Sequence, residues 1–371
     1  MAKVLLVHHG CYIGGGGKGA LTVSQMLREM GHEVVILNST YKRDMFNCFN
    51  DNGFRCIEHK GLMGSIMHYS GGPNLFSRTF LTNLFNINAT KNRIIEVISQ
   101  ENPDLVIVNS IVLAWLSIIL RKLEIKSICF IRETPIKGIF TNITKVFLRK
   151  FSVLAFISEY DKDFYKLNNT KCIVIKDTIK FDESLLKITK RQACEKLKVS
   201  SKNFNILFLG GTSELKGWKT VEKCIDMVEN MEVKFVVAGY SDEAKKINNK
   251  KVQYIGVVEN IQYMYKACDL VILPSKEPHQ LMPIFEAGFF MVPVITSDFK
   301  QIRENITNGE TGLTIQPNSP QQLCSAINKI FTDKELRGKL INNNFKKALE
   351  HEYTITRNIF EKEINEILKK V

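Results

Sequence analysis

Short apolar runs alternate with longer segments of helical period along the chain, and this alternation limits the fold more than any other feature. It is typical of parallel β-sheets whose strands are joined by crossover helices. The predicted strands form two series, which are residues 3–9, 33–37, 104–109, 127–131, 153–158 and 172–175, then 204–211, 234–239, 252–256, 269–275, 292–296 and 311–315. We therefore expect an α/β fold with two sheets.

A polar and charged segment, residues 176–203, separates the two series of strands. Because 371 residues are enough for two domains, we expect a first domain at 1–185 and a second at 186–352. Residues 354–371 have the pattern of a long amphipathic helix. Open α/β sheets bind ligands at the carboxyl ends of their strands. Two facing sheets would therefore place a site in the cleft between the domains.

The composition narrows the class of protein. A net charge of +13 favours anionic partners such as phosphates or an acidic membrane surface. Nucleic acid is not expected, because no basic stripe interleaved with aromatic residues is present. The nine cysteines are scattered without a C-x-x-C pair, which is typical of reduced thiols in the cytoplasm. No zinc-like ligand spacing appears, so we predict no metal site.

Membrane-spanning and secretory segments are not expected either. The most apolar stretch, residues 105–120, is too short to span a bilayer, and Asn109-Ser110 falls where a turn would lie. We interpret it as a buried strand followed by a helix. The first residues lack the cationic, apolar and small-residue regions of a signal peptide.

A run of glycines follows the first predicted strand. Gly14, Gly16 and Gly19 match the pattern G-x-G-x-x-G, but a dinucleotide site would also require an acidic residue where Asn38 ends the second strand. Glycines allow a ligand to approach the backbone, and the start of the following helix, expected from about Lys18 to Met30, favours an anion. A nicotinamide or flavin site and a plain surface loop are the alternatives.

Two features of the second series also suggest an anionic ligand. Lys216 lies at the start of a helix that follows a strand, where a diphosphate is its natural partner. In the stretch 277–288, Pro283 suits the first turn of a helix, whose unpaired N–H groups can bind phosphate. Glu286, one turn further, could accept hydrogen bonds from sugar hydroxyls. A simple surface glutamate is the alternative.

The order and spacing of these blocks resemble the nucleotide-sugar glycosyltransferases of the GT-B fold, specifically glycosyltransferase family 4, the glycosyl transferases group 1. The blocks that carry the resemblance are the glycine run, "KG" at 216–217, "VVAG" at 236–239, "YIGVV" at 254–258, "ACDLVILPS" at 267–275 and "FEAGFFMVPVITSD" at 285–298. The resemblance implies two Rossmann-like domains that face each other across a cleft. It assigns the acceptor to the first domain and the donor to the second, and it implies that the helix 353–371 packs back on the first.

The implied reaction is a metal-independent transfer that retains the configuration of the sugar, with a UDP- or GDP-sugar as donor and no cofactor. By resemblance, Lys216 would stabilise the leaving diphosphate, Glu286 would bind the ribose, and Glu277 would contact the donor sugar. Arg132 and Glu133, in a block at a strand end, would orient the acceptor. The other implied donor-binding residues are Gly15, Gly16, Gly17, Gly211, Thr212, Gly239, Gly256, Val257, His279, Leu281, Met282 and Pro283.

Three departures from the family pattern stand out. Glu277 and Glu286 have eight residues between them, where the family usually has seven. A phosphate-binding arginine is missing, because Gly211-Thr212 stands in its place. His279 and Gln280 replace an aromatic residue and a glycine. The alternatives are therefore a sugar-nucleotide epimerase of the same fold and a non-catalytic subunit that binds nucleotide sugars.

The predicted first domain contains two apolar segments that suggest the acceptor. Residues 137–151 have the pattern of a basic amphipathic helix, and residues 70–85 are more apolar than a loop requires. We expect a glycan or polyprenyl-linked acceptor of lipopolysaccharide, capsule or similar synthesis, with the protein peripheral at the inner face of the cytoplasmic membrane. Burial of both segments in the core is the alternative. Asp161 and Asp163 form a D-x-D pair that we interpret as solvated helix surface.

Overall fold

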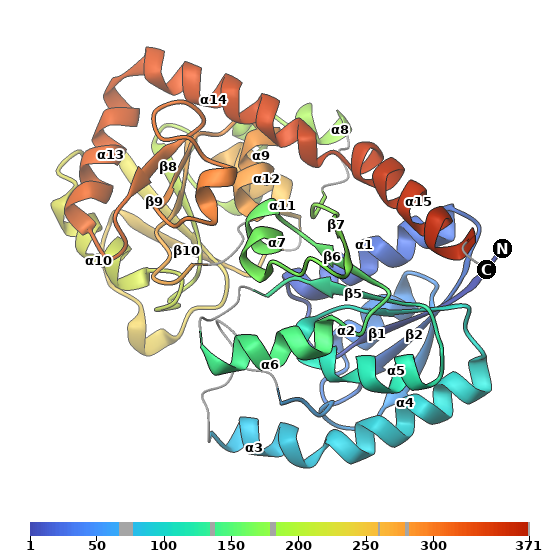
Figure 1. Ribbon diagram of the computed structural model, residues 1–371. Coiled ribbons are helices and arrows are strands. Elements are labelled where there is room, and N and C mark those ends of the chain that lie inside the picture. Colours follow the sequence, from blue (N-terminus) through green and yellow to red (C-terminus); the bar gives the residue numbers. More distant parts are fainter. Residues whose placement is uncertain (67–76, 134–137, 179–182, 259, 279–281, 370–371) are drawn as a thin grey trace. The chain divides into compact units, whose positions relative to one another are not determined.

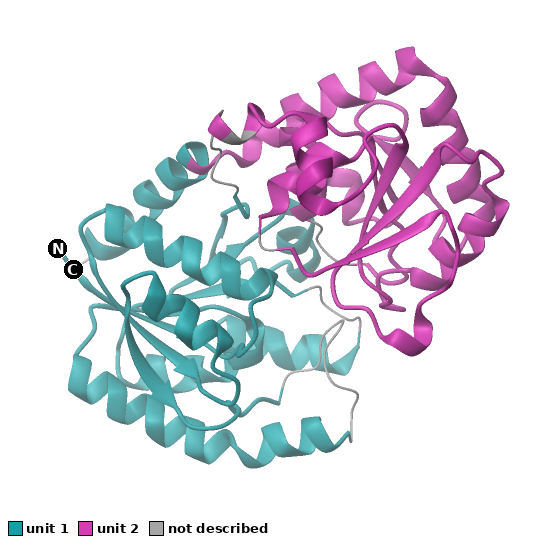
Figure 2. Cartoon of the chain, turned by 180° about the vertical axis from the view of Figure 1, so that it is seen from behind, with its two compact units in different colours: residues 1–178, 354–371 teal, residues 179–353 magenta. Residues whose placement is uncertain are grey.

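The structure is a computed structural model that describes residues 1–66, 77–133, 138–178, 183–258, 260–278 and 282–369 (Figure 1). The chain divides into two compact units (Figure 2). Unit 1 contains residues 1–178 together with 354–371, and unit 2 contains residues 179–353. The chain passes from unit 1 to unit 2 within the polar segment that separates the two predicted series of strands.

Unit 1 is built on a seven-stranded sheet of order β3-β2-β1-β4-β5-β6-β7, in which all the described strand pairs are parallel. The strands are β1 (Lys3–His8), β2 (Glu33–Ser39), β3 (Arg55–His59), β4 (Leu105–Val108), β5 (Ser127–Ile131), β6 (Val153–Phe156) and β7 (Lys171–Val174). The helices are α1 (Gly15–Glu29), α2 (Asp44–Asp51), α3 (Arg78–Phe85), α4 (Ile87–Glu101), the 3-10 helix η1 (Ile111–Leu116), α5 (Ser117–Lys122), α6 (Ile139–Leu148), α7 (Glu159–Tyr165) and α15 (Tyr353–Lys369).

Unit 2 repeats the design with a six-stranded parallel sheet of order β10-β9-β8-β11-β12-β13. The strands are β8 (Phe204–Leu209), β9 (Val233–Ala238), β10 (Val252–Gly256), β11 (Leu270–Leu273), β12 (Val294–Ser297) and β13 (Leu313–Ile315). The helices are α8 (Glu183–Leu186), α9 (Lys190–Leu197), α10 (Trp218–Met227), α11 (Ile261–Ala267), α12 (Met282–Phe289), α13 (Pro320–Thr332) and α14 (Lys334–Ala348), with short 3-10 turns η2 (Glu243–Lys245), η3 (Ile302–Glu304) and η4 (Leu349–His351).

The strands are apolar on both faces because helices cover both sides of each sheet. In unit 2, Leu207 of β8 and Val271 of β11 belong to one core cluster. Their neighbours Ile206 and Ile272 belong to a second cluster on the opposite face. This alternation follows from the period of two along a strand, and it explains why the strands are continuous apolar runs.

The fold agrees with the sequence-based prediction, and every predicted strand is present. Helix α1 is the main exception among the helices, because it begins at Gly15 rather than near Lys18, so that three glycines form its first turn. The prediction also omitted β3 (Arg55–His59), an edge strand with only one fully buried residue. Residues 105–120 form a strand followed by helices, as expected.

The last helix belongs to unit 1. Phe360 of α15 packs on Phe130 of β5 with ring centroids 6.2 Å apart. The ammonium of Lys171, in β7, lies 2.7 Å from a carboxylate oxygen of Glu363. Among the described residues, none of the helices is both long enough and apolar enough to cross a membrane.

The interpretation of the D-x-D pair as solvated surface was wrong for Asp161. Its side chain is 1% exposed, because it lies in the first turn of α7 and accepts a hydrogen bond from the hydroxyl of Ser158 at 2.7 Å. Ser158 also caps the helix by accepting from the Asp161 N–H at 3.1 Å. Asp163 is exposed, as expected.

Candidate functional site

Each sheet reverses its strand order next to its first strand. β1 lies between β2 and β4 in unit 1, and β8 lies between β9 and β11 in unit 2. Such a switch point opens a crevice at the carboxyl ends of the strands, which is where ligands of open α/β sheets bind. The glycine-rich segments of both units follow these strands.

Glycines allow close contacts among four strand ends of unit 2, those of β8, β9, β10 and β11. Gly211 has φ +53°, and a Cβ atom there would lie 1.7 Å from the carbonyl oxygen of Tyr240, after β9. Gly217 has φ +92°, and its Cβ would lie 1.9 Å from the carbonyl oxygen of Pro274, after β11. The Gly239 N–H donates to the Gly256 carbonyl at 2.7 Å. A side chain at Gly211 or Gly217 would overlap these carbonyl oxygens, so the backbone itself forms this part of the edge.

Lys216 lies in this edge, two residues before α10. Its side chain is partly buried, and burial lowers the pKa of its ammonium from the ordinary lysine value. A partly desolvated cation gains more from an anionic ligand than a solvated one. The neighbouring Thr212 hydroxyl accepts a hydrogen bond from the Asp242 N–H at 2.7 Å, which fixes the loop after β8 to the loop after β9.

Helix α12 begins at Met282, with Pro283 in its first turn and Glu286 one turn further, as predicted. Glu286 accepts a hydrogen bond on Oε2 from the hydroxyl of Tyr265, in α11, at 2.5 Å. Tyr265 is fully buried, and its ring stacks on that of Phe290 with centroids 5.4 Å apart. Tyr265 was not predicted as a site residue, because nothing in its local sequence distinguishes it from a core aromatic residue.

The other predicted residues of unit 2 that the structure describes lie at the ends of β10 and β11. Glu277 is exposed in the turn after β11. Gly256, with φ +69°, ends β10, and the Val257 side chain that follows it is 77% exposed. His279 and Leu281 lie outside the described residues.

In unit 1, the glycine run forms the start of a helix. Gly14 is the N-cap of α1, and Gly15, Gly16 and Gly17 form the first turn. A Cβ at Gly17 would lie 2.4 Å from the sulfur of Met45, so α2 packs closely against this turn. The arrangement leaves backbone N–H groups at the helix start, which favour an anion.

Arg132 follows β5, and its side chain is only 6% exposed. Its Nε donates to the side-chain oxygen of Asn109 at 2.9 Å, and its guanidinium forms an ion pair with Asp177. The Asn109 amide in turn donates to the Gly16 carbonyl at 3.0 Å and lies 3.2 Å from Nδ1 of His8. Arg132 therefore connects the ends of β5, β4 and β1.

Glu133 also makes internal contacts. It accepts hydrogen bonds from the hydroxyl of Ser110 and, at 3.0 Å, from the N–H of Ile111. Burial raises the pKa of its carboxyl group above the ordinary value. Burial also lowers the pKa of His8 to about 3, so its imidazole is neutral at physiological pH. No role was predicted for His8 or Asn109, although both lie at the carboxyl ends of buried strands, beside the switch point of this sheet.

Within the described ranges, no group of three or more His, Cys, Asp or Glu side chains could hold a metal ion. The arrangement in unit 2 instead offers a cation, a helix start and a carboxylate at neighbouring strand ends. These groups can bind a phosphate-containing ligand that also carries hydroxyl groups.

Comparisons with known proteins agree with this chemistry. Residues 189–347 match the family model described as Glycosyl transferases group 1. A curated relative from Campylobacter jejuni, N,N'-diacetylbacillosaminyl-diphospho-undecaprenol alpha-1,3-N-acetylgalactosaminyltransferase, is 25% identical over 189 residues, which cover 48% of this chain and 50% of the relative. The chain thus spans about half the length of this relative.

Solved structures match over the whole chain. A glycosyltransferase from Rickettsia africae has a TM-score of 0.78 at 20% identity, covering 100% of this chain and 99% of that one. The Anabaena protein HepE in complex with UDP-glucose also has a TM-score of 0.78, at 14% identity. The match covers 99% of this chain and 100% of HepE. These likenesses establish the fold. Residues 189–347 therefore form a glycosyl transferases group 1 domain, within a chain that has the two-sheet architecture of GT-B glycosyltransferases.

Proposed function

We propose that the protein is a retaining glycosyltransferase that moves a sugar from a nucleoside diphosphate sugar to a glycan or lipid-linked acceptor of the cell envelope. The observation that carries this proposal is the placement of Lys216, the start of α12 and Glu286 at neighbouring strand ends of unit 2. All three lie within the part of the chain that matches the glycosyl transferases group 1 family. HepE, a structural neighbour, binds UDP-glucose.

In this proposal, unit 2 binds the donor, with UDP or GDP as the nucleotide. Lys216 and the first turn of α12 hold the diphosphate, and Lys216 stabilises the negative charge that develops as the bond to the sugar breaks. Glu286 accepts hydrogen bonds from the ribose, and the exposed Glu277 reaches the donor sugar. Gly256 and Val257 lie beside the base. The transfer uses no metal, so these protein groups carry the whole charge stabilisation.

Unit 1 binds the acceptor, and the backbone N–H groups at the start of α1 favour a negatively charged group of the ligand. Arg132 forms a hydrogen bond with Asn109, and Glu133 forms hydrogen bonds with Ser110 and Ile111. In this proposal they orient the acceptor by fixing the ends of β4 and β5. An acceptor on a polyprenyl diphosphate is consistent with the Campylobacter relative, whose name specifies a diphospho-undecaprenol.

Two helices of unit 1 support an acceptor at a membrane surface. Helix α3 has no buried residue, and its Phe85 is 81% exposed. In α6, Ile139 is 71% exposed and Val146 is 53% exposed. Hydrogen bonds of Ser65 to Asn83 of α3 (3.1 Å) and to Val112 of η1 (2.7 Å) place α3 beside η1, on which α6 also packs.

The charge of these segments suits an anionic bilayer. Residues 77–95 and 138–158 contain no aspartate or glutamate, but both contain arginine and lysine. Exposed apolar side chains beside basic ones bind the boundary between headgroups and acyl chains. We therefore place the protein in the cytoplasm, peripheral at the inner face of the membrane.

A transfer assay tests the proposed reaction. Purified protein is incubated with UDP- and GDP-sugars and a polyprenyl-diphosphate-linked sugar, and the product linkage is determined by NMR. The proposal expects a glycoside with the same anomeric configuration as the donor. An inverted product would contradict retention, and isomerisation of the donor sugar without acceptor would identify an epimerase.

Vesicle flotation tests the membrane surface separately. We expect recovery with phosphatidylglycerol vesicles and little with phosphatidylcholine alone. Replacing Ile139 and Val146 by serine should abolish flotation. The matched control is a second double variant, in which serine replaces Ile355 and Ile359 of α15. Both isoleucines are 48% exposed. Equal flotation of the two double variants would refute the assignment of α6.

A further inference from the structure

The buried contact between Tyr265 and Glu286 joins two helices of unit 2. The Tyr265 hydroxyl, in α11, donates to Oε2 of Glu286, in α12, at 2.5 Å. The tyrosine side chain is 0% exposed, so this hydroxyl is withdrawn from water. Burial and the nearby Glu286 charge raise the pKa of Tyr265 well above its ordinary value, so it stays a hydrogen-bond donor at every physiological pH.

Both ends of this hydrogen bond are held in place. The Tyr265 ring stacks on Phe290 with an interplanar angle of 6°, which restricts its rotation. Helix α12 is fixed against α14, where the Asn344 side-chain amide donates to the Ile284 carbonyl at 3.2 Å. A buried polar group has few alternative partners, so the hydroxyl and the carboxylate determine each other's orientation.

Glu286 is only partly buried, so it can present its carboxylate to a ligand while Tyr265 holds Oε2. A glutamate side chain has several rotatable bonds, and recognition of a hydroxyl pair depends on a fixed orientation of the acceptor oxygens. Without the tyrosine hydroxyl, the carboxylate would sample other rotamers and would lose an internal partner.

We propose that Tyr265 is a positioning residue for ribose recognition: its hydrogen bond to Oε2 sets the orientation in which Glu286 accepts hydrogen bonds from the ribose hydroxyls. This inference rests on the proposed function, in which Glu286 binds the ribose of the donor. It adds that the preference of the site for ribose over deoxyribose depends on a residue that does not touch the ligand.

The test measures this preference by calorimetry. Dissociation constants are determined for UDP and GDP and for their 2′-deoxy and 3′-deoxy forms, and the ratio of deoxy to ribo values is compared between variants. For the wild type we expect a ratio of about ten or more, because hydrogen bonds to a charged group are strong. Tyr265→Phe should lower the ratio below about three.

The matched control is Tyr263→Phe, which removes the same atom from the same helix. None of the hydrogen bonds that the described residues make involves the Tyr263 hydroxyl, so the ratio should stay at the wild-type value. Phe290→Leu, which removes the stacking but keeps the hydroxyl, should give an intermediate ratio. Thermal melting will show whether Tyr265→Phe folds. If it does not, Phe290→Leu provides the test in its place.

The outcomes separate this inference from the function on which it rests. If the wild type discriminates and Glu286→Gln does not, Glu286 binds the ribose. If Tyr265→Phe and Phe290→Leu then keep the full ratio, the positioning role of Tyr265 is refuted while the donor site stands. If the wild type binds the ribo and deoxy forms equally, the assignment of Glu286 fails, and the inference fails with it.

Discussion

Gly288 of α12 lies directly against Ala348 of α14: a Cβ added at Gly288 would be 2.7 Å from the Cβ of Ala348 and 2.8 Å from the carbonyl oxygen of Asn344. Two helices approach this closely only when one of them lacks a side chain at the contact. Glu286 lies two residues earlier on the same helix.

Replacing Gly288 by alanine should therefore overpack the contact and lower the free energy of unfolding by about 1–3 kcal/mol. Gly338→Ala in α14 is the matched control, because a Cβ there meets nothing within 4 Å. It should raise stability by up to about 1 kcal/mol through helix propensity. Urea denaturation of both variants measures the difference, and a Gly288→Ala protein as stable as the wild type would show that α12 can shift freely.

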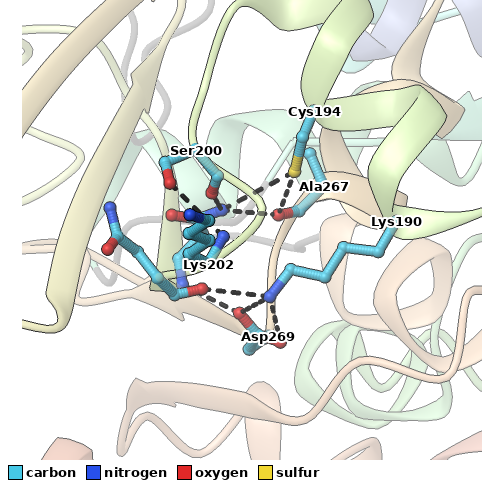
Figure 3. A network of polar contacts seen from close by, with 8 residues as sticks. Lys190, Cys194, Ser200, Lys202, Ala267 and Asp269 are labelled. Carbon is cyan, nitrogen blue, oxygen red and sulfur yellow. Dashed lines mark hydrogen bonds and ion pairs between the residues drawn. The ribbon is translucent and has the colours of Figure 1, made fainter.

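Lys190 should stabilise unit 2 through its contacts at the amino end of the sheet (Figure 3). Its ammonium lies 2.9 and 2.7 Å from the two carboxylate oxygens of Asp269 and 3.0 Å from the Asn203 carbonyl. Oδ2 of Asp269 also accepts from the Asn205 N–H at 2.8 Å. Lys190→Met leaves this half-buried carboxylate without its cation. We therefore expect the free energy of unfolding to fall by about 1–2 kcal/mol.

Arg191→Met provides the control for Lys190→Met. Arg191 is the next residue and pairs with Glu195 on the same helix, but its side chain is 83% exposed. Exposed pairs of this kind contribute less than about 0.5 kcal/mol. Equal losses for the two variants in urea denaturation would contradict the importance of the Asp269 network.

The affinity for the nucleoside diphosphate should decrease at alkaline pH. Burial lowers the pKa of Lys216 below the ordinary lysine value of 10.5. Only the protonated amine attracts a diphosphate, so affinity is full below the lowered pKa and is lost as the pH rises through it. The loss is at most about tenfold per pH unit, because one proton is involved.

Lys216→Arg is the control for this pH dependence, because a guanidinium stays charged throughout the range. Calorimetric titrations from pH 7 to 10.5 on both proteins cancel any ionisation of the ligand itself. Parallel profiles for lysine and arginine would mean that residue 216 does not face the diphosphate.

The fold followed from local patterns, because buried parallel strands are continuous apolar runs and their helices have a clear period. The edge strand β3 was missed because Arg55–His59 is polar and half-buried, so its pattern is not that of a core strand. The start of α1 was placed too late, because glycine has a low helix propensity and the neighbouring strand end and α2 determine the first turn.

Positions in the candidate site could be predicted where they follow from rules that apply to residues close together in the sequence. Pro283 and Glu286 lie on one helix at the predicted positions, because a proline in the first turn is a local rule. Tyr265 and Asn109 could not be found in this way. Tyr265 and Glu286 are 21 positions apart in the sequence, and Asn109 and Gly16 are 93 positions apart. Only the packed fold brings the two members of each pair together.

In the proposed function, unit 2 binds a nucleoside diphosphate sugar through Lys216 and Glu286. The most direct test is calorimetric binding of UDP-, GDP-, ADP- and CMP-sugars, with NAD as the comparison ligand, to the wild type and to Glu286→Ala and Lys216→Ala. We expect that one nucleoside diphosphate series binds and that each substitution weakens binding at least tenfold, or about 1.4 kcal/mol. Binding of NAD alone, or unchanged affinity in both variants, would contradict it.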